Sequence, residues 1–184
     1  FASLVVIAAG GGLVYNMRAV PAEPPRIAVL PFDATGVEPA LAQGLSDELL
    51  SPLSRSSELR VIGRTSSDQF RGKAEDLRSI GRKLDVQYVV EGTVRSSHDQ
   101  LHIAVSLIRA RDGSAIWAQT FKSSPDGLQP VQAAIGSQIG QTLDLQPIPV
   151  AKSTPDGRAY ALYLRAKTLM RDRDFDGLPK AIEL

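Results

Sequence analysis

The sequence predicts an α/β (α+β) fold, in which a mixed sheet of about five strands is covered by helices. Two observations predict it: short runs rich in Ile, Val and Leu alternate with segments of helical apolar spacing, and three strand-like runs joined by tight-turn signals follow near the middle. The resulting order is β-α-β-α-β-β-β-α, which favours a mixed sheet. We also expect an N-terminal transmembrane helix and a C-terminal helical hairpin.

The composition excludes several classes of function. The 184 residues are 43% hydrophobic and 22% charged, which is ordinary for one globular domain with attachments. The net charge of +1 argues against a dedicated nucleic-acid-binding domain in these residues. The chain has no cysteine, which excludes disulfide scaffolds, zinc ribbons, iron–sulfur sites and thiol catalysis.

The first element is an uncharged apolar segment, residues 1–17 (FASLVVIAAGGGLVYNM). As a helix it would span about 25 Å, at the short end of what crosses a hydrocarbon core. Tyr15 and Arg18 are typical of an interfacial ending. We expect a truncated transmembrane helix that attaches the protein to the membrane, followed by a Pro-rich linker at residues 18–25. The apolar part of a signal peptide cleaved near Ala22, or a buried strand or helix of a soluble core, remain alternatives.

The predicted domain, residues 26–145, begins with a strand, a turn and a helix. Residues 26–32 (RIAVLPF) form an apolar run between two prolines, which indicates a buried strand. Residues 33–36 form a turn. Pro39 suits the first turn of a helix, which would bury one stripe of leucines spaced by four. The stripe consists of Leu41, Leu45, Leu49 and Leu53.

A second strand and a second helix follow. Residues 59–64 (LRVIGR) read as the strand. Residues 65–67 (TSS) are expected to form a cap or turn that leads to Phe70. Residues 76–84 (DLRSIGRKL) form an amphipathic helix, because their leucine and isoleucine residues fall on one side.

Three strands joined by hairpins come next, and a helix closes the domain. The strands are predicted at residues 86–94, 101–108 and 114–121. Turns are predicted at residues 97–100 and at residues 111–113, where Asp-Gly is a strong tight-turn signal. Residues 128–143 carry apolar side chains spaced by four and therefore read as a helix.

The C-terminal segment is predicted to start a helical repeat. Residues 146–155 (QPIPVAKSTP) contain three prolines and read as a linker. In residues 156–184, Asp156 opens a helix, Ala166 lies near a position that is often glycine in tetratricopeptide repeats, and Pro179 suits the start of a second helix. An ordinary helical hairpin is the alternative. Such a piece should be poorly stable alone, because repeats bury their faces against stacked neighbours.

We predict no catalytic, cofactor-binding or metal-binding residue. Gly72 and Lys73 lack P-loop spacing, and Ala74 stands where a hydroxyl is required. His98 and His102 lie on a hairpin without a carboxylate cluster, and we expect them to be solvated. Residues 65–67 have no nearby base.

We expect the remaining charged residues and the tryptophan to have structural rather than ligand-binding roles. We expect Asp47 and Glu48 on a helix surface without an obvious partner, and Trp117 in the core or at its edge. Five basic residues are interleaved with serines and acids, which favours a solvated face over a weak anion site. They are Arg55, Arg60, Arg64, Arg71 and Lys73.

Four phrases, in order, resemble the TolB amino-terminal-like domain of bacterial membrane-tethered regulators, which is also related to the flagellar FlgO domain. They are AVLPF (28–32), VIGRTSS (61–67), GRKLDVQYVVEGTVR (81–95) and DGSAIWA (112–118). The resemblance covers about residues 26–143 and implies no catalytic residues. It also implies one preceding membrane helix, following tetratricopeptide repeats, and an upstream cytoplasmic output module. That module is most often a winged-helix DNA-binding domain of the CadC/ToxR style, and sometimes a nucleotide cyclase or protein kinase.

The predicted function is that of a receptor region rather than an enzyme. We expect residues 18–184 to be the periplasmic sensory and protein-interaction part of a single-pass signalling protein of the bacterial inner membrane, with a winged-helix transcriptional regulator as the whole. A protein or peptide partner is expected, without a cofactor and without nucleic acid bound to these residues; the oligomeric state stays open. The alternatives are the sensor region of an adenylate or guanylate cyclase or protein kinase, or a periplasmic envelope scaffold released by a signal peptidase.

Overall fold

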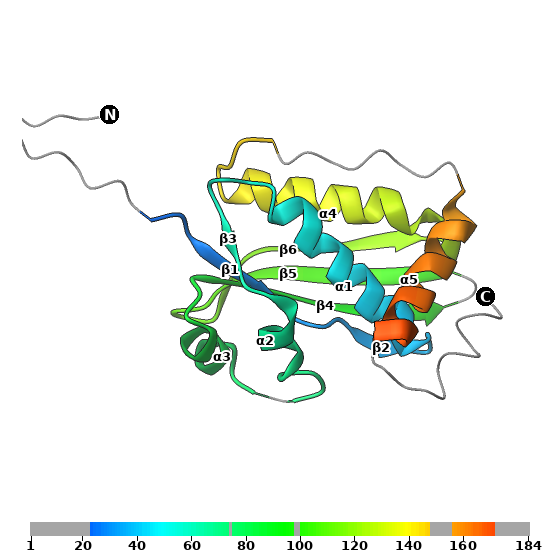
Figure 1. The fold of residues 1–184 in the computed structure, drawn as a ribbon, viewed down its shortest axis with the longest axis horizontal. Helices are drawn as coiled ribbons and strands as arrows, with labels where there is room; N and C mark the ends of the chain where they lie inside the picture. Colours follow the sequence, from blue (N-terminus) through cyan, green and yellow to red (C-terminus); the bar gives the residue numbers. More distant parts are fainter. Residues whose placement is uncertain (1–22, 74, 98–99, 148–155, 172–184) are drawn as a thin grey trace, which may run out of the picture.

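The computed structural model describes residues 23–73, 75–97, 100–147 and 156–171. Within these ranges the chain forms one six-stranded mixed sheet with helices packed on it (Figure 1). The strands are β1 (Arg26–Val29), β2 (Asp33–Thr35), β3 (Arg60–Val61), β4 (Tyr88–Ser97), β5 (Gln100–Arg109) and β6 (Ser114–Ser123). Their order is β3-β1-β4-β5-β6, with β2 also paired to β4.

The sheet is mixed because only its first half is parallel. β1 pairs in parallel with both β3 and β4, whereas the hairpin strands β4, β5 and β6 pair antiparallel. The predicted mixed sheet covered by helices is therefore confirmed. At the second hairpin, the Gly113 amide donates to the Arg109 carbonyl over 2.9 Å, as the Asp-Gly signal predicts. Residues 98–99 of the first predicted hairpin lie outside the described residues.

The predicted turn at residues 33–36 is wrong for most of its length. Residues 33–35 form β2, which pairs in parallel with β4 in the register Asp33↔Thr93. The physical reason is the length of β4, since β1 pairs only with its first residues, Tyr88 to Val90. The chain continues past Pro31 along the same edge and supplies partners for the remainder of β4.

Five α-helices and one short 3₁₀ helix complete the described residues. They are α1 (Pro39–Leu53), α2 (Arg64–Asp68), α3 (Leu77–Leu84), the 3₁₀ helix η1 (Pro125–Gly127), α4 (Leu128–Thr142) and α5 (Gly157–Arg171). The predicted helices at residues 39–53, 76–84 and 128–143 are confirmed. The Asp76 side chain caps α3 by accepting a hydrogen bond from the Arg78 backbone amide. The strand predicted at residues 59–64 is only two residues long, and residues 65–67 lie inside α2 rather than in a turn.

Two separate hydrophobic cores hold the layers together. On one face, α1, α4 and α5 pack on the sheet (Figure 1), and β5 contributes every second side chain, from Leu101 to Leu107. On the other face, a smaller core joins Ala28 and Val89 of the sheet to Phe70, Ile80 and Leu84. This second core covers only the part of the sheet around β1 and the start of β4.

The helix α5 packs on the domain although the sequence places it in a separate helical segment. Tyr160, Ala161 and Leu164 belong to the same buried cluster as the leucines of α1. The approach is close, because a Cβ on Gly44 would lie 2.8 Å from the Leu164 Cβ. Residues 148–155 of the predicted linker and residues 172–184 lie outside the described residues.

None of the helices in the described ranges has the length and apolarity that a bilayer span needs. The predicted transmembrane helix at residues 1–17 and most of the following linker lie outside those ranges.

Candidate functional site

The candidate site is the part of the second sheet face that no helix of the described residues covers. Along each hairpin strand, side chains alternate between the main core and this face. The register places Glu91, Ser106 and Ala118 in one row across β4, β5 and β6. The next two rows are Thr93, Ala104 and Thr120, and Arg95, His102 and Lys122. We call these nine residues the open sheet face.

The open sheet face is mostly polar, with small side chains in its middle row and long charged side chains in the rows on either side. Its residues are half-buried or exposed, whereas the alternate residues Val94, Ile103 and Val105 are almost fully buried. An antiparallel sheet with one face packed and one face free commonly shows this alternation. The sequence pattern of β5 therefore reflects a sheet with one face packed by the described helices and the other face left open by the described residues.

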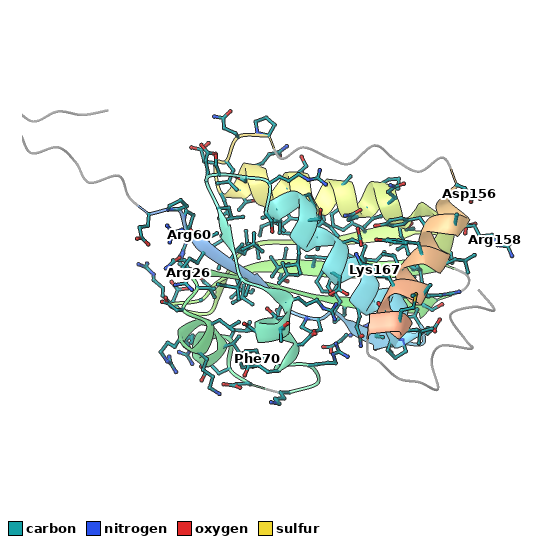
Figure 2. The ribbon with its side chains drawn as sticks, in the orientation of Figure 1. Arg26, Arg60, Phe70, Asp156, Arg158 and Lys167 are labelled. Carbon is teal, nitrogen blue, oxygen red and sulfur yellow. The ribbon has the colours of Figure 1, made fainter. Side chains whose placement is uncertain are left out.

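Two adjoining hollows lie on this face and together form one trough. The first has a volume of about 560 Å³, and its lining residues include Glu91, Thr93, Ala104, Ser106 and Phe70. Figure 2 labels Phe70, which lies beside α2. The second, of about 540 Å³, shares Thr93 and Ala104 with the first. The shared residues make the two hollows continuous along β4 and β5.

The two ends of the trough carry opposite charge. Asp33, Glu75 and Glu91 line the first hollow together with Lys73. Arg95 and His102 line the second. An elongated ligand with charges at both ends would therefore bind in one preferred direction, because the reverse direction would place like charges together.

Glu91 is the most unusual residue of the trough. Its carboxylate is half-buried, and among the described residues it makes no hydrogen bond or ion pair. Burial, and to a lesser degree the neighbouring Asp33 carboxylate, raises the pKa of Glu91 above its ordinary value of 4.5. A half-buried carboxyl group without a partner, at the base of a hollow, is typical of a binding site.

The expectation that Asp47 and Glu48 lack partners is wrong. Asp47 pairs with Arg64 of α2 over 2.8 Å, and its side chain is only 9% exposed. Glu48 forms an ion pair with Lys167 of α5, which Figure 2 labels. The Glu48 carboxylate also accepts a hydrogen bond from the Tyr163 hydroxyl over 3.1 Å. These partners are distant in sequence, so local spacing could not indicate them.

The basic residues do not form one common face. Arg64 is mostly buried and bridges Asp47 and Asp68, the latter over 3.0 Å. Arg71 also pairs with Asp68, over 3.1 Å, while Arg60 pairs with Glu23. The predicted solvated face is therefore wrong for Arg64, since its charge is neutralised by two aspartates from two elements.

Trp117 lies at the edge of the main core, and His102 lies on the open sheet face. Trp117 packs against the main core beside Phe121, at 6.3 Å between ring centroids, so its predicted place at the core edge is confirmed. His102 lies in the second hollow of the trough, and His98 lies outside the described residues. In the described part of the chain, no group of three or more His, Asp or Glu side chains is arranged to hold a metal ion.

Comparison with known families decides the relationship of the chain. The sequence model of the HilA/YgeH-like transcriptional regulator second domain matches residues 23–137, well over half of the chain. The chain belongs to this family. The HilA/YgeH-like second domain therefore comprises the whole sheet with α1 and most of α4, and thus the open sheet face.

Two curated proteins are related to this HilA/YgeH-like domain. "Putative adenylate cyclase 3" of Rhizobium meliloti is 34% identical over 122 residues, which are 65% of this chain and 21% of that protein. The Tol-Pal system protein TolB of Alkalilimnicola ehrlichii is 25% identical over 114 residues, which are 61% of this chain and 27% of that protein. The chain thus spans about a quarter or less of the length of each relative.

A solved structure shows the same fold. TolB from Acinetobacter baumannii superposes with a TM-score of 0.51 at 17% identity, covering 67% of this chain and 29% of TolB. The predicted resemblance to TolB is confirmed by this fold and by the curated TolB relative.

Proposed function

We propose that this HilA/YgeH-like second domain is a protein-interaction module and that it binds an extended segment of a partner protein in the trough of the open sheet face. The observation that carries the proposal is Glu91 in the lining of that trough, which is half-buried and has no hydrogen-bond or ion-pair partner among the described residues. The family match to a transcriptional regulator domain supports a role in signalling. Enzymatic activity is not part of the proposal.

The trough suits an extended polypeptide of mixed charge. Small side chains along its floor, such as Thr93 and Ala104, let a backbone approach the sheet closely. A Lys or Arg side chain of the partner would neutralise Glu91 and Asp33 at one end. An Asp or Glu side chain would pair with Arg95 at the other end.

We also propose that the protein is anchored in a membrane. Residues 1–17 would anchor the protein in the bacterial inner membrane as a single-pass helix, with residues 18–184 in the periplasm. Support comes from the uncharged apolar sequence of that segment and from the TolB relative, whose name places it in the Tol-Pal system. Partner binding would act on an upstream cytoplasmic module by shifting a population between two states.

The upstream module is proposed to be a winged-helix DNA-binding domain, because the family is named for transcriptional regulators. A second candidate is an adenylate cyclase, which the 34% identical relative favours through its name. Residues 156–184 are proposed to begin tetratricopeptide repeats, of which α5 would be the first helix.

Site-specific photo-crosslinking in the full-length protein in living bacteria tests the proposed interaction surface. A photoreactive amino acid at Thr93 or Thr120 should crosslink to one partner protein, identified by mass spectrometry. The same amino acid at exposed Gln141 of α4, on the helical side, is the matched control. A partner captured from Gln141 but not from the trough positions would contradict the proposal.

A further inference from the structure

A groove lined by arginines lies at the end of the sheet where β4 begins. It is distinct from the trough, although α3 borders both hollows. Its volume is about 740 Å³. Arg78 and Arg82 of α3 line one side, and Arg109 and Arg111 at the end of β5 line the other. The buried side chains of Val86 and Ala110 also line it. We call the surface formed by the four arginines the arginine groove.

Close packing of α3 on β5 brings the two pairs of arginines together. A Cβ on Gly81 would collide with the Ala110 Cβ, so glycine is required for this approach. Arg78 and Arg82 are four residues apart and therefore lie on the same side of α3.

Positive charge exceeds negative charge around the groove. With Arg26, five guanidinium groups face the three carboxylates of Asp76, Asp85 and Asp112. Asp112 is shared by Arg109 and Arg111, each at 3.4 Å. Arg82 has no ion-pair partner among the described residues. The exposed side chains can therefore offer donors to a further anion, in excess of what the carboxylates and the carbonyl end of α3 neutralise.

The chain enters the domain beside this groove. The Arg26 amide donates to the Gln87 Oε1 atom over 2.7 Å, and the Arg26 guanidinium pairs with Asp85. Both acceptors line the groove. Figure 2 shows Arg26 at the opposite end of the molecule from Arg158 of α5. Residues 18–25 could extend at most about 28 Å from the end of the apolar segment, so an anchored domain would hold the groove near the membrane surface.

We propose that the arginine groove binds the phosphate groups of anionic lipid headgroups. Guanidinium groups recognise phosphate oxygens by paired hydrogen bonds, and several arginines near one surface add their attractions. The choice of lipid as the source of phosphate rests on the proposed membrane anchor, whereas phosphate binding by the groove does not. Binding would fix the orientation of the domain, with the trough directed away from the point of attachment.

Hydrogen–deuterium exchange of the full chain in lipid nanodiscs tests the proposal. Exchange in residues 82–88 is compared between discs of phosphatidylcholine and discs that also contain phosphatidylglycerol. We expect exchange to be about fivefold slower with phosphatidylglycerol. The double variant Arg82→Glu with Arg111→Glu should lose this protection, while Arg55→Glu with Arg158→Glu, an equal change of charge at exposed positions outside the groove and the trough, should keep it. Thermal unfolding should show that both variants are folded.

Three results would overturn the proposal. The first is equal exchange in the two kinds of disc, and the second is unchanged protection in the groove variant. The third is the same protection from inorganic phosphate or polyglutamate added to phosphatidylcholine discs, which would assign the groove to a soluble anion or an acidic protein. Failure of the anchor is seen separately, as failure of the chain to co-elute with phosphatidylcholine discs. The groove is then tested by adding phosphatidylglycerol discs to the free chain.

Discussion

At the scale of single residues, two carboxylates that are both partly or almost wholly buried have different roles. Asp47 is almost buried and is neutralised by Arg64, so it stabilises the contact between α1 and α2. Glu91 is half-buried without such a partner, and its raised pKa records the unfavourable free energy of its charged form. The first is structural and the second is available to a ligand.

The substitution Glu91→Gln should stabilise the protein at neutral pH. Because the native state raises this pKa, it binds more protons than the unfolded chain above the ordinary value of 4.5. The free energy of unfolding of the wild type therefore falls as pH rises through the raised pKa. We expect the variant's advantage in the free energy of unfolding to be near zero at about pH 4 and to grow toward about pH 7, while staying below about 1 kcal/mol because the group is half-exposed. Urea unfolding of both proteins at each pH measures it. An advantage that shrinks with rising pH would contradict the raised pKa.

The substitution Arg64→Ala should destabilise the domain by about 2–3 kcal/mol, because it leaves the Asp47 carboxylate buried without its partner. Arg71→Ala is the matched control, since Arg71 is more exposed and we expect a loss below about 1 kcal/mol. Urea unfolding of both variants measures the difference. Equal losses in the free energy of unfolding would show that burial of the Asp47–Arg64 pair does not increase its contribution to stability.

At the scale of elements, the docking of α5 joins the sheet domain to the C-terminal helical segment. Leu164 is fully buried in the main core, and Thr168 donates to the Ala40 carbonyl over 3.2 Å. The Tyr160 hydroxyl donates to Gln132 of α4 over 2.8 Å. These contacts hold α5 against both α1 and α4, so a repeat that begins with α5 would be attached directly to the sheet domain.

The substitution Leu164→Ala should cost about 2–4 kcal/mol in the free energy of unfolding, because it opens a cavity in the main core. Met170→Ala, on the same helix at 61% exposure, should cost less than about 0.5 kcal/mol. Urea unfolding followed by circular dichroism makes the comparison. If Leu164→Ala were as mild as Met170→Ala, α5 would not share the core of the domain.

At the scale of the whole molecule, the arginine groove and the trough lie in different places with different chemistry. The groove opens where the chain enters the sheet, and the trough extends along β4 and β5 toward their far ends. This separation would allow one end of the domain to contact a membrane while the open sheet face stays free for a partner.

The substitution Val6→Arg tests the membrane anchor. A charge in the middle of an apolar span costs about 2.5–3.5 kcal/mol on insertion, so the full-length protein should shift from the membrane fraction to the soluble fraction. Val20→Arg adds the same charge outside the apolar segment and should leave the protein in the membrane fraction. If wild type and Val6→Arg were both soluble, the anchor would be disproved.

The sequence by itself determined the type and order of the long elements, because apolar periodicity is a local property. The leucine stripe of α1 and the alternation in β5 are examples. The sequence could not determine β2 or α2, because segments of three and five residues are too short to show a period. Only the tertiary structure decided which distant groups meet, such as Asp47 with Arg64 and α5 with α1. It also decided which side of β4 and β5 remains uncovered, because periodicity specifies a face but not what packs on it.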